Sequence, residues 1–519
     1  LTPQIVKNEN VTEEEFARVS ENLAFLPGVD VTTDWERRYE YGNTLKTVLG
    51  KVTDYDEGLP KEKLDYYLSR DYSRNDRVGK SYLEMQYEDV LHGQKAKERV
   101  ITDKAGNIVE IEPISEGKRG KDLVLTIDMD LQLAVEKIIE EELRRAKSSA
   151  GSYFLDRAFV VVLDPKTGDV LTMAGKQLAR NKETGRTEMQ DFALGTITTS
   201  YNVGSTVKGA TVLTGYMTGA ISPGTVLYDA PLKIKGTPEK SSWRNFGNLN
   251  DIRALRVSSN VYMFKTAIAI GNGYYQHNAP LRLDTEAFDV MRESFAQFGL
   301  GSRTGIDLPN EMVGFKGMKK DPGFLLDLSI GQYDTYTPMQ LAQYVATIAN
   351  GGYRVQPRLV KEIREPVDDE EGLGPVVKEI PPKVLNRIEL DGSAIRRVQE
   401  GFRQVLQNPE GTGYSRFRGA NYNPAGKTGT AEAFYDGPLR PNYDAPPEVI
   451  NLSFVAYAPF DDPEVAISVI VPWAYTGRSG YGSNTIIGRR VLDTYFELKN
   501  KGGKETAEQT EEENAADEE

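Results

Sequence analysis

The sequence predicts an α+β protein, in which an antiparallel sheet flanked by helices follows a long polar region. Three observations lead to this fold class. At 519 residues the chain is too long for one ordinary core, so two or three domains are expected. Roughly the first 120 residues are polar and rich in tyrosine and charge. Beyond them, a predicted hairpin and three late strands enclose a helix-rich stretch, an arrangement typical of an α+β domain.

Two elements are predicted in the polar region. Thr12 is placed to cap a helix, and Glu15 completes a capping box with it. Val100–Ile111 is predicted to be a hairpin, with two extended runs around Asp103–Asn107. Because no long apolar run is present, we expect this region to be a loosely packed spacer.

A strand and a long helix lead into the second region. Leu123–Ile127 is a short apolar run typical of a strand, and Asp128 can cap the helix that follows it. That helix is expected over Met129–Lys147, because apolar residues recur on one face at helical spacing: Leu131, Val135, Ile138 and Ile139.

Short apolar runs bounded by turn residues predict the sheet. Ala158–Leu163 and Val170–Met173 form the first hairpin, around the turn Asp164–Asp169. The later strands are expected around Gly426–Ala433, Asn451–Ala458 and Glu464–Pro472. We expect all five strands to share one antiparallel sheet.

Two helices near this sheet have clear boundaries. Thr337 is the expected N-cap of one, Pro338 its first residue and Gly351-Gly352 its stop. The other is expected over Ser483–Leu498, and the charged segment after it is expected to be disordered.

These elements divide the chain into four predicted segments. They are a spacer domain over residues 1–120, a connecting strand and helix over 121–150, a catalytic-type α+β domain over 151–500 and an acidic tail over 501–519.

Composition excludes several function classes. The net charge of −14 falls to −6 once the eight acidic residues of Glu505–Glu519 are set aside, so no basic field for nucleic acid is present. The absence of cysteine excludes disulfides, thiolate metal sites and cysteine nucleophiles. The two histidines, His92 and His277, lie in no motif, so a histidine triad is not expected. Lysine is the base that remains.

No run approaches the roughly 18 apolar residues of a membrane span. The first residue is leucine, and no signal segment is present. We therefore expect the natural N-terminus to lie upstream of this chain.

Three short motifs carry the predicted chemistry. Ser205 and Lys208 lie three residues apart at a predicted helix start, a spacing that places both side chains on one face. Ser258 and Asn260 form a Ser-x-Asn element, and Lys427-Thr428-Gly429-Thr430 begins a predicted strand. A second Ser-x-x-Lys at Ser115 lies in a glycine-bracketed loop, and a second Lys-Thr-Gly at Lys166 is a hairpin tip.

The spacing predicts a role for each residue. Ser205 is the expected nucleophile, and Lys208 is the expected base, its pKa lowered by burial and by Lys427. Ser258 and Asn260 are expected to relay a proton and to hold Lys208 and the substrate amide.

The Lys427 strand is expected to bind the substrate. Thr428 and Thr430 would bond a substrate carboxylate, with Lys427 supplying charge. Gly429 would let the substrate backbone approach an edge strand. The N–H groups of Ser205 and Thr430 are the expected oxyanion donors.

On these motifs the chain resembles class B penicillin-binding proteins, most closely the Gram-positive elongation type of rod-shaped growth. Further segments are similar to that family: Gly79–Tyr82, Tyr87–Gly93, Leu125–Gln132, Gly331-Gln332 and Thr337–Leu341. The family's Arg-Gly-x-Ile element is not found. The resemblance implies a penicillin-binding, serine β-lactamase-like transpeptidase domain preceded by an elongated pedestal of the dimerisation type.

The resemblance also implies an activity and partners. Ser205 would form an acyl-enzyme with stem pentapeptides ending in D-Ala-D-Ala and cross-link them in cell-wall synthesis. β-Lactam antibiotics would acylate the same serine. No metal or organic cofactor is implied. The protein would be anchored in the cell membrane with its catalytic domain outside, beside a polytopic glycosyltransferase of the elongation complex.

Three alternatives stay open. A serine β-lactamase shares the nucleophile but needs a base for deacylating water, and its class A form expects Ser-Asp-Asn where this chain has Ser259 in the middle. A D,D-carboxypeptidase would use water in place of an amine. A catalytically silent scaffold for wall synthesis would keep the fold without the chemistry.

Overall fold

The structure is a computed structural model that describes residues 6–7, 10–31, 35, 37–54, 56–104, 108–182, 184–367, 372–477 and 481–516. Only the backbone is described for 24, 108, 111 and 502–516. Most of the predicted hairpin turn (residues 105–107) and the end of the acidic tail lie outside these ranges.

The chain forms two compact units, residues 1–42 and 43–519. The first contains α1 (Glu13–Glu21) and the 3₁₀ turn η1 (Leu23–Phe25). The predicted capping box is confirmed: Thr12 Oγ1 accepts from the N–H of Glu15 at 3.2 Å, and the Glu15 carboxylate accepts from the N–H of Thr12 at 3.1 Å. No residue of α1 is buried.

The boundary between the two units falls after Gly42, so most of the predicted spacer domain over residues 1–120 belongs to the second unit. Leu45, Val48 and Leu83 belong to the main hydrophobic core. The hydroxyl of Tyr87 donates to Asp307 Oδ2 at 2.8 Å. The segments around these residues are therefore packed against the rest of the second unit, whereas Leu59, Tyr67, Tyr72 and Val78 form a small core of their own.

The polar region of the second unit holds short helices and a two-stranded antiparallel hairpin. Its elements are α2 (Lys46–Leu49), η2 (Lys61–Lys63), α3 (Leu64–Leu68), α4 (Tyr82–Gln86), α5 (Glu88–Leu91), β1 (Lys97–Thr102) and β2 (Ile108–Ser115).

The predicted connection follows. β3 (Asp122–Leu125) pairs with β10 (Val360–Arg364), which also pairs with β11 (Val376–Glu379). Asp128 caps α6 (Met129–Lys147) by accepting from the N–H of Leu131 at 3.0 Å, as predicted.

The predicted α+β domain is organised around one six-stranded antiparallel sheet of order β13-β14-β15-β4-β5-β6. Its strands are β4 (Arg157–Leu163), β5 (Val170–Arg180), β6 (Thr187–Asp191), β13 (Ala425–Phe434), β14 (Glu448–Ala458) and β15 (Val465–Tyr475). The predicted single sheet is confirmed. The sequence missed β6, because its polar residues carry no strand pattern and it forms only by pairing with the long end of β5.

Helices and short strands fill the sequence between β6 and β13. They are α7 (Gly195–Thr198), η3 (Gly204–Val207), α8 (Lys208–Met217), β7 (Leu227–Asp229), β8 (Gly247–Leu249), α9 (Asp251–Arg256), α10 (Asn260–Ile270), α11 (Ala287–Gln297), α12 (Pro322–Ser329), α13 (Pro338–Ala349), β9 (Tyr353–Val355), β12 (Val384–Arg387), α14 (Gly392–Gln407) and α15 (Tyr414–Phe417); η4 (Arg440–Asn442) follows β13. The predicted boundaries of α13 are confirmed, with Thr337 and Gln340 forming a capping box.

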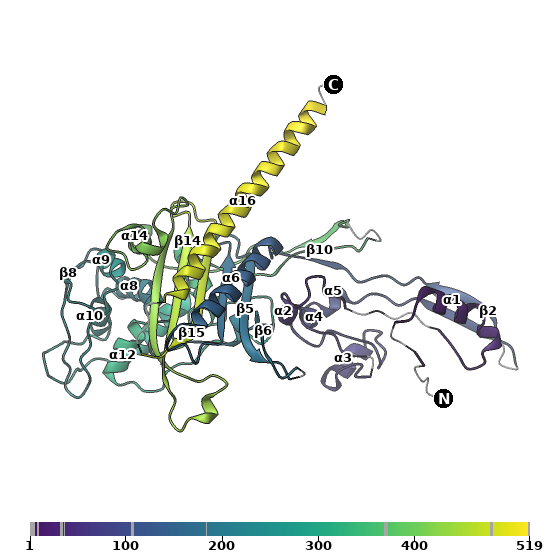
Figure 1. Cartoon of the computed structure of the whole chain (residues 1–519), viewed down its shortest axis with the longest axis horizontal. Coiled ribbons are helices and arrows are strands. Elements are labelled where there is room, and N and C mark those ends of the chain that lie inside the picture. Colours follow the sequence, from purple (N-terminus) through teal and green to yellow (C-terminus); the bar gives the residue numbers. More distant parts are fainter. Residues whose placement is uncertain are drawn as a thin grey trace. The chain divides into compact units, whose positions relative to one another are not determined.

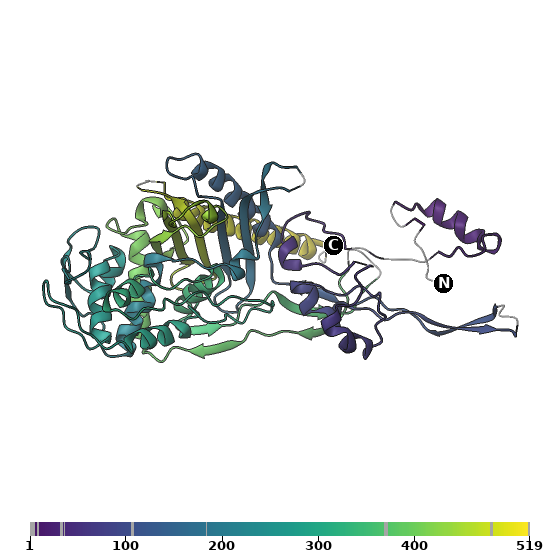
Figure 2. The same cartoon turned by 90° about the horizontal axis from the view of Figure 1, so that it is seen from below.

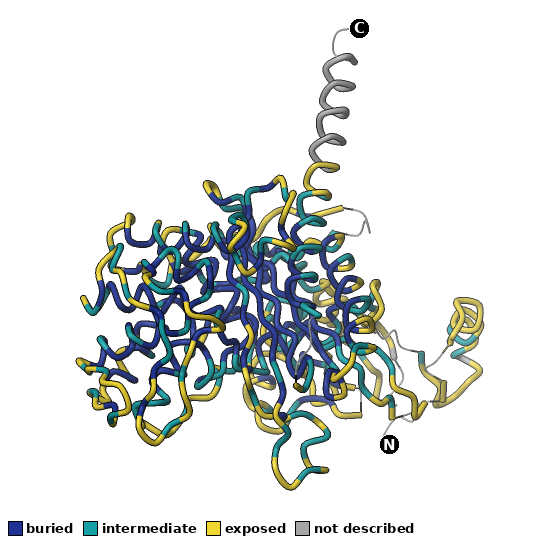
Figure 3. The backbone as a smooth tube through the Cα atoms, turned by 60° about the vertical axis from the view of Figure 1, so that its left-hand side comes forward, coloured by how far each residue is buried: buried dark blue, intermediate teal, exposed yellow. Residues whose placement is uncertain are grey.

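The two faces of the sheet bury different cores, because successive side chains of a strand point to opposite sides. In β4, Phe159, Val161 and Leu163 belong to one cluster, which includes α8, α10 and α13. Val160 and Val162 belong to the other cluster, under α6 and the final helix α16 (Ser483–Ala516). Figures 1 and 2 show α6 and α16 side by side on the sheet. Figure 3 shows the strands of the sheet as the most deeply buried part of the domain.

The final helix corrects one prediction. α16 runs over Ser483–Ala516, well beyond Leu498 and through most of the segment expected to be disordered. The sequence after Leu498 contains no proline and is rich in Glu, Lys and Ala, which favour helix. The helix propensity of these residues outweighs the repulsion between the charges of the segment.

Candidate active site

A cavity of about 440 Å³ lies beside the edge strand β13. All three predicted motifs contribute to its wall. The described lining residues are Ser205, Trp243, Ser258, Asn260, Ile330, Gln332, Thr412, Thr428, Gly429, Thr430, Leu452, Tyr475, Tyr481, Gly482, Asn484 and Thr485. No histidine, aspartate or glutamate is among these described lining residues.

Ser205 lies in η3, one turn before the α-helix begins at Lys208. The predicted helix start at Ser205 is therefore a 3₁₀ turn that passes directly into the α-helix. Side chains three residues apart still share a face, because in a 3₁₀ helix residues i and i+3 lie directly above one another. Ser205 is partly exposed and lines the cavity.

Close backbone packing positions the Ser205 turn against β13. Gly204 has φ +58°, and a Cβ on it would lie 2.2 Å from the carbonyl oxygen of Thr430. A Cβ on Gly331, with φ +74°, would lie 2.3 Å from the carbonyl oxygen of Gly204. The backbone beside Ser205 thus lies directly against the backbone of Thr430, which only glycine at these positions allows.

The reason predicted for Gly429 is wrong. A Cβ at Gly429 would point into the protein, 2.1 Å from Ser453 Oγ and 2.5 Å from the carbonyl oxygen of Val203. Glycine is required there because β13 packs against the turn that carries Ser205, not because a substrate needs the space. A larger residue would push the nucleophile turn away from the strand.

The amine of Lys208 is fully buried and makes three hydrogen bonds. Its Nζ lies 2.8 Å from the carbonyl oxygen of Ser258, 3.2 Å from Ser258 Oγ and 2.7 Å from Asn260 Oδ1. In the described part of the chain it makes none with Ser205. Both residues of the Ser-x-Asn element therefore hold the amine directly, as predicted.

A single hydroxyl joins two buried lysines. Ser258 Oγ lies 2.9 Å from Lys427 Nζ as well as 3.2 Å from Lys208 Nζ. Lys427 Nζ also donates to the carbonyl oxygen of Thr428 at 2.9 Å. Burial lowers the pKa of Lys427 to about 7. Burial, and then the charge of Lys427, hold the pKa of Lys208 well below its ordinary value.

These pKa shifts matter for the chemistry. An amine can take a proton from a hydroxyl only when it is itself unprotonated. Two fully buried amines linked through one oxygen disfavour a double positive charge. The site can therefore hold a neutral lysine near neutral pH.

Ser258 has an unusual backbone. Its φ of +57° is left-handed, a conformation that costs a non-glycine residue of the order of 1 kcal/mol. In this conformation both its carbonyl oxygen and its hydroxyl reach Lys208 Nζ.

β13 presents the second wall of the cavity. Thr428 pairs with Phe454 and Thr430 with Leu452, while the other edge of the strand is unpaired. Half of its backbone groups can therefore bond an extended ligand. The hydroxyl of Thr428 lies 2.7 Å from that of Thr412.

Thr412 and Trp243 are site residues that the sequence did not indicate. Thr412 lies in the loop after α14, which carries no motif. Trp243 is 64% exposed, and its Nε1 donates to the carbonyl oxygen of Val257 at 2.9 Å. The sequence shows only that this tryptophan lies 15 residues before the Ser-x-Asn element, and its exposure becomes visible in the structure.

The rejected motif copies lie elsewhere. Ser115 ends β2, and Lys118 is exposed. Lys166 lies at a turn and pairs with Asp462 at 2.5 Å. None of the three lines the cavity.

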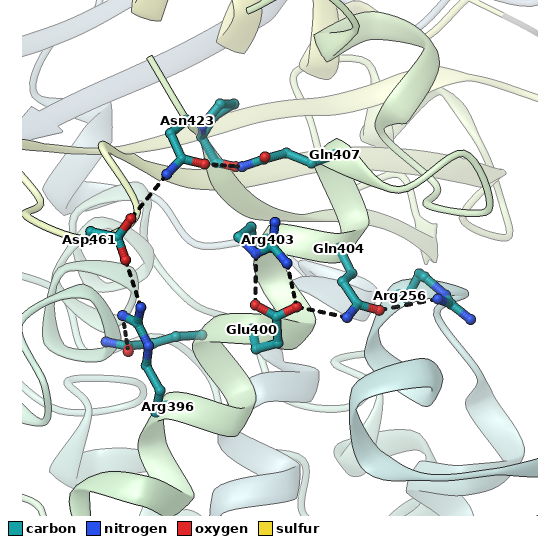
Figure 4. A network of polar contacts seen from close by, with 10 residues as sticks. Arg256, Arg396, Glu400, Arg403, Gln404, Gln407, Asn423 and Asp461 are labelled. Carbon is teal, nitrogen blue, oxygen red and sulfur yellow. Dashed lines mark hydrogen bonds and ion pairs between the residues drawn. The ribbon is translucent and has the colours of Figure 1, made fainter. Parts of the chain in front are cut away.

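A polar network on α14 connects the elements behind the cavity (Figure 4). Gln404 accepts from Arg256, which ends α9 two residues before Ser258, at 3.2 Å. One turn later, Gln407 donates to Asn423 Oδ1, just before β13, at 2.7 Å. One helix thus braces both the Ser258 loop and the start of the Lys427 strand.

The chain matches two family profiles. The penicillin binding protein transpeptidase domain matches residues 158–493, and the penicillin-binding protein dimerisation domain matches residues 1–125. The first match spans more than half of the chain. The chain belongs to the penicillin-binding proteins.

Individual members of the family agree with this assignment. The chain is 56% identical to penicillin-binding protein 2A of Bacillus subtilis over 98% of its own length and 70% of the relative's. It is 45% identical to penicillin-binding protein H of the same organism, over 96% and 68%. The solved structure of penicillin-binding protein 2B from Streptococcus pneumoniae matches with a TM-score of 0.81 at 33% identity, over 95% of this chain and 78% of that one.

These findings confirm a class B penicillin-binding protein related to the Gram-positive elongation type, with a serine-type transpeptidase domain. They also confirm the predicted fold class. Within the described residues, the structure contains no helix both long and apolar enough to cross a membrane.

Proposed function

We propose that this chain is a peptidoglycan D,D-transpeptidase that works through an acyl-enzyme on Ser205. The observation that carries the proposal is the pair of buried amines, Lys208 and Lys427, joined by Ser258 Oγ beside the Ser205 turn. This arrangement supplies a base and a proton relay without histidine.

Each residue has a role in the first half-reaction. Ser205 Oγ attacks the carbonyl carbon of the penultimate D-Ala while neutral Lys208 takes the hydroxyl proton. The oxyanion accepts hydrogen bonds from the N–H groups of Ser205 and Thr430, whose backbones lie together. Ser258 passes a proton to the leaving D-Ala amine, and the C–N bond breaks to leave an ester on Ser205.

The Lys427 strand positions the substrate. Thr428 and Thr430 bond the terminal carboxylate of the stem peptide, and Lys427 supplies charge from behind the strand. Asn260 holds Lys208 and the substrate amide. In the second half-reaction an amine of a neighbouring stem attacks the ester, and Ser205 recovers its proton.

The absence of carboxylates from the described cavity wall favours this function over a β-lactamase. Rapid hydrolysis of the acyl-enzyme needs a base that activates water, and a carboxylate is the usual one. A penicillin would open its ring on Ser205 and leave no group that departs, so the ester would persist.

The cellular setting belongs to the same proposal. We infer a membrane-anchored protein with its catalytic domain outside the cell, acting beside a polytopic glycosyltransferase of the elongation complex. The family resemblance supports this setting.

The test is labelling by a fluorescent penicillin. We expect the purified chain to be labelled, the S205A variant to remain unlabelled and the matched S115A variant to be labelled at the normal rate. Labelling of S205A would refute the proposal.

Two further measurements separate the alternatives. Mass spectrometry should show a penicilloyl-enzyme that lasts for many minutes, whereas turnover within seconds would favour a β-lactamase. D-Ala release from a stem peptide should be accompanied by a cross-linked product when an acceptor amine is added. Release to water alone would favour a carboxypeptidase, and no reaction at all would favour a scaffold.

A further inference from the structure

A buried carboxylate lies behind the Ser258 wall of the site. Asp229 ends β7 and is 2% exposed. Its Oδ2 accepts from Ser242 Oγ at 2.7 Å and from Ser259 Oγ. Its Oδ1 is buried and has no hydrogen-bond partner among the described residues. Asp229 and Ser242 lie outside the sequence motifs, Ser259 is the middle residue of the Ser-x-Asn element, and none of the three has a role in the proposed reaction.

The two serine hydroxyls have their protons committed to Asp229. A hydroxyl has one proton and two lone pairs, so each serine can then only accept further bonds. Ser242 Oγ accepts from the N–H groups of Asn260, at 3.0 Å, and Val261, at 3.2 Å. Ser259 Oγ accepts from the N–H of Tyr262 at 3.0 Å.

Together these bonds provide acceptors for the N–H groups at the N-terminus of α10. The first N–H groups of a helix have no partner within the helix. Here three of them bond the two serines, and the N–H of Ser259 donates to the carbonyl oxygen of Ala254 at 2.9 Å. A negative charge at this end is also favoured by the helix dipole.

The network fixes the residues that hold the proposed base. Asn260 is the first residue of α10, and its Oδ1 accepts from Lys208. Its Nδ2 donates to the carbonyl oxygen of Ser241 at 3.1 Å, next to Ser242. The segment that carries Ser242 therefore holds Asn260 by both its backbone and its side chain.

The charge of Asp229 acts on the same amine. Within the described chain, none of the hydrogen bonds of Lys208 or Lys427 goes to a carboxylate. Asp229 favours the protonated form of Lys208, against burial and the charge of Lys427. The other cation influenced by Asp229 is Lys265 on α10, whose Nζ donates to the carbonyl oxygen of Tyr228.

We propose that Asp229 is a positioning residue of the transpeptidase site, which fixes Ser258 and Asn260 through Ser242 and Ser259 and supplies a counter-charge for Lys208. The inference rests on the proposed function of Ser205 and Lys208. Asp229 touches no substrate, so its effect reaches the reaction through the position and the basicity of Lys208.

The test measures the second-order rate constant of penicillin acylation as a function of pH. In D229N the amide oxygen can still accept from both serines, but the charge is gone. The ammonium form of Lys208 then loses a favourable partner, so its pKa falls, and we expect the acid limb of the profile to move to lower pH by about half a unit or more. In D229E the charge is kept and the limb should stay at its normal pH.

A second variant separates position from charge. S242A keeps the carboxylate but leaves two N–H groups of α10 without their acceptor. We expect its plateau rate to fall about tenfold to a hundredfold, since small displacements of a base cost that much, while the acid limb stays in place. D251N is the matched control, because Asp251 is a buried carboxylate of the same domain that pairs with Arg397 and not with the site. Its profile should match that of the normal chain.

The outcomes separate the two proposals. An acid limb that stays in place in D229N, or one that moves equally in D229E, overturns the role of the charge. A normal plateau in S242A overturns the positioning role. If the unsubstituted chain is not acylated at all, the proposed function fails instead. Thermal unfolding of each variant shows whether the protein assayed is folded.

Discussion

Lys-Thr-Gly occurs twice in this chain, and the two lysines differ in almost every physical property. Lys166 lies at a hairpin turn, with its side chain 48% exposed, and its hydrogen bond with Asp462 raises its pKa. Lys427 lies in an edge strand, fully buried, and burial lowers its pKa to about 7. The same three letters therefore produce an ordinary surface cation in one place and a poised amine in the other.

The two Ser-x-x-Lys copies also differ in their surroundings. Ser115 and Lys118 are exposed, whereas Lys208 is buried among groups from distant segments. A motif supplies the residue types, and the surrounding structure decides whether they become reactive. Paired substitutions in the two copies test this directly.

The largest effect is expected at the proposed base. Lys208→Ala should lower the rate constant of penicillin acylation about a thousandfold or more, because the hydroxyl of Ser205 loses its proton acceptor. Lys118→Ala should leave it unchanged. Stopped-flow labelling measures both, and cooperative thermal unfolding of Lys208→Ala shows that the fold survives. Equal rates in the two variants would remove the distinction between the copies.

The next effect concerns the two Lys-Thr-Gly lysines. Lys427→Ala removes one end of the Ser258 bridge and the charge behind the strand, so acylation should slow about 100- to 1,000-fold. Lys166→Ala should stay within about twofold, because a surface ion pair has little effect on a distant site. A comparable loss in both would mean that the hairpin tip also serves the reaction.

The opposite pKa shifts predict different pH dependence of stability. Between pH 7 and about 10, an unfolded lysine binds a proton that folded Lys427 lacks, so stability should rise with pH. Relative to Lys427→Met, the natural chain should gain at most about 1.4 kcal/mol per pH unit in this window. Below pH 7 Lys427 is protonated in both states, and the difference should be constant.

Urea unfolding at several pH values measures this dependence, and Lys166→Met is the control. Exposed Lys166 stays protonated in both states over most of the window, so its substitution should leave the pH dependence unchanged. A natural chain that loses stability relative to Lys427→Met as the pH rises from 7 to 9 would contradict burial as the cause of the shift.

The smallest effect on the acylation rate is expected from a substitution at Thr412, and Thr167 provides the comparison. Thr412→Val removes the hydroxyl bonded to Thr428, and acylation should slow about threefold to tenfold, the value of one hydrogen bond. Thr167 Oγ1 accepts from the N–H of Asp169 within its own turn and lies outside the described cavity wall, so Thr167→Val should have no effect on the rate. Steady-state labelling against a penicillin concentration series measures both. An equal response would show that the Thr412 bond does not serve the site.

Much of the fold was predictable because its signals are local. The caps of α1, α6 and α13 depend on residues three positions apart, and strand alternation in β4 spans a few residues. β6 and the length of α16 were not predicted. The first depends on pairing with β5, and the second depends on a balance between helix propensity and charge.

The residues of the candidate site were predicted from the sequence, but the structural role of each residue was not always predicted correctly. Ser205, Lys208, Ser258, Asn260 and Lys427 to Thr430 all come together at one cavity or directly behind it. Gly429, however, is required by packing against Val203 and Ser453, segments that no local pattern connects to it.

The sequence by itself determined the family, the order of the motifs and the absence of a histidine or cysteine alternative. Only the tertiary structure decided that Ser258 joins two buried lysines and that Thr412 and Asp229 support the site. The physical reason is the distance along the chain over which each interaction acts. Periodicity and capping act within about four residues, whereas burial, pKa and close backbone contact depend on every segment that packs around a group.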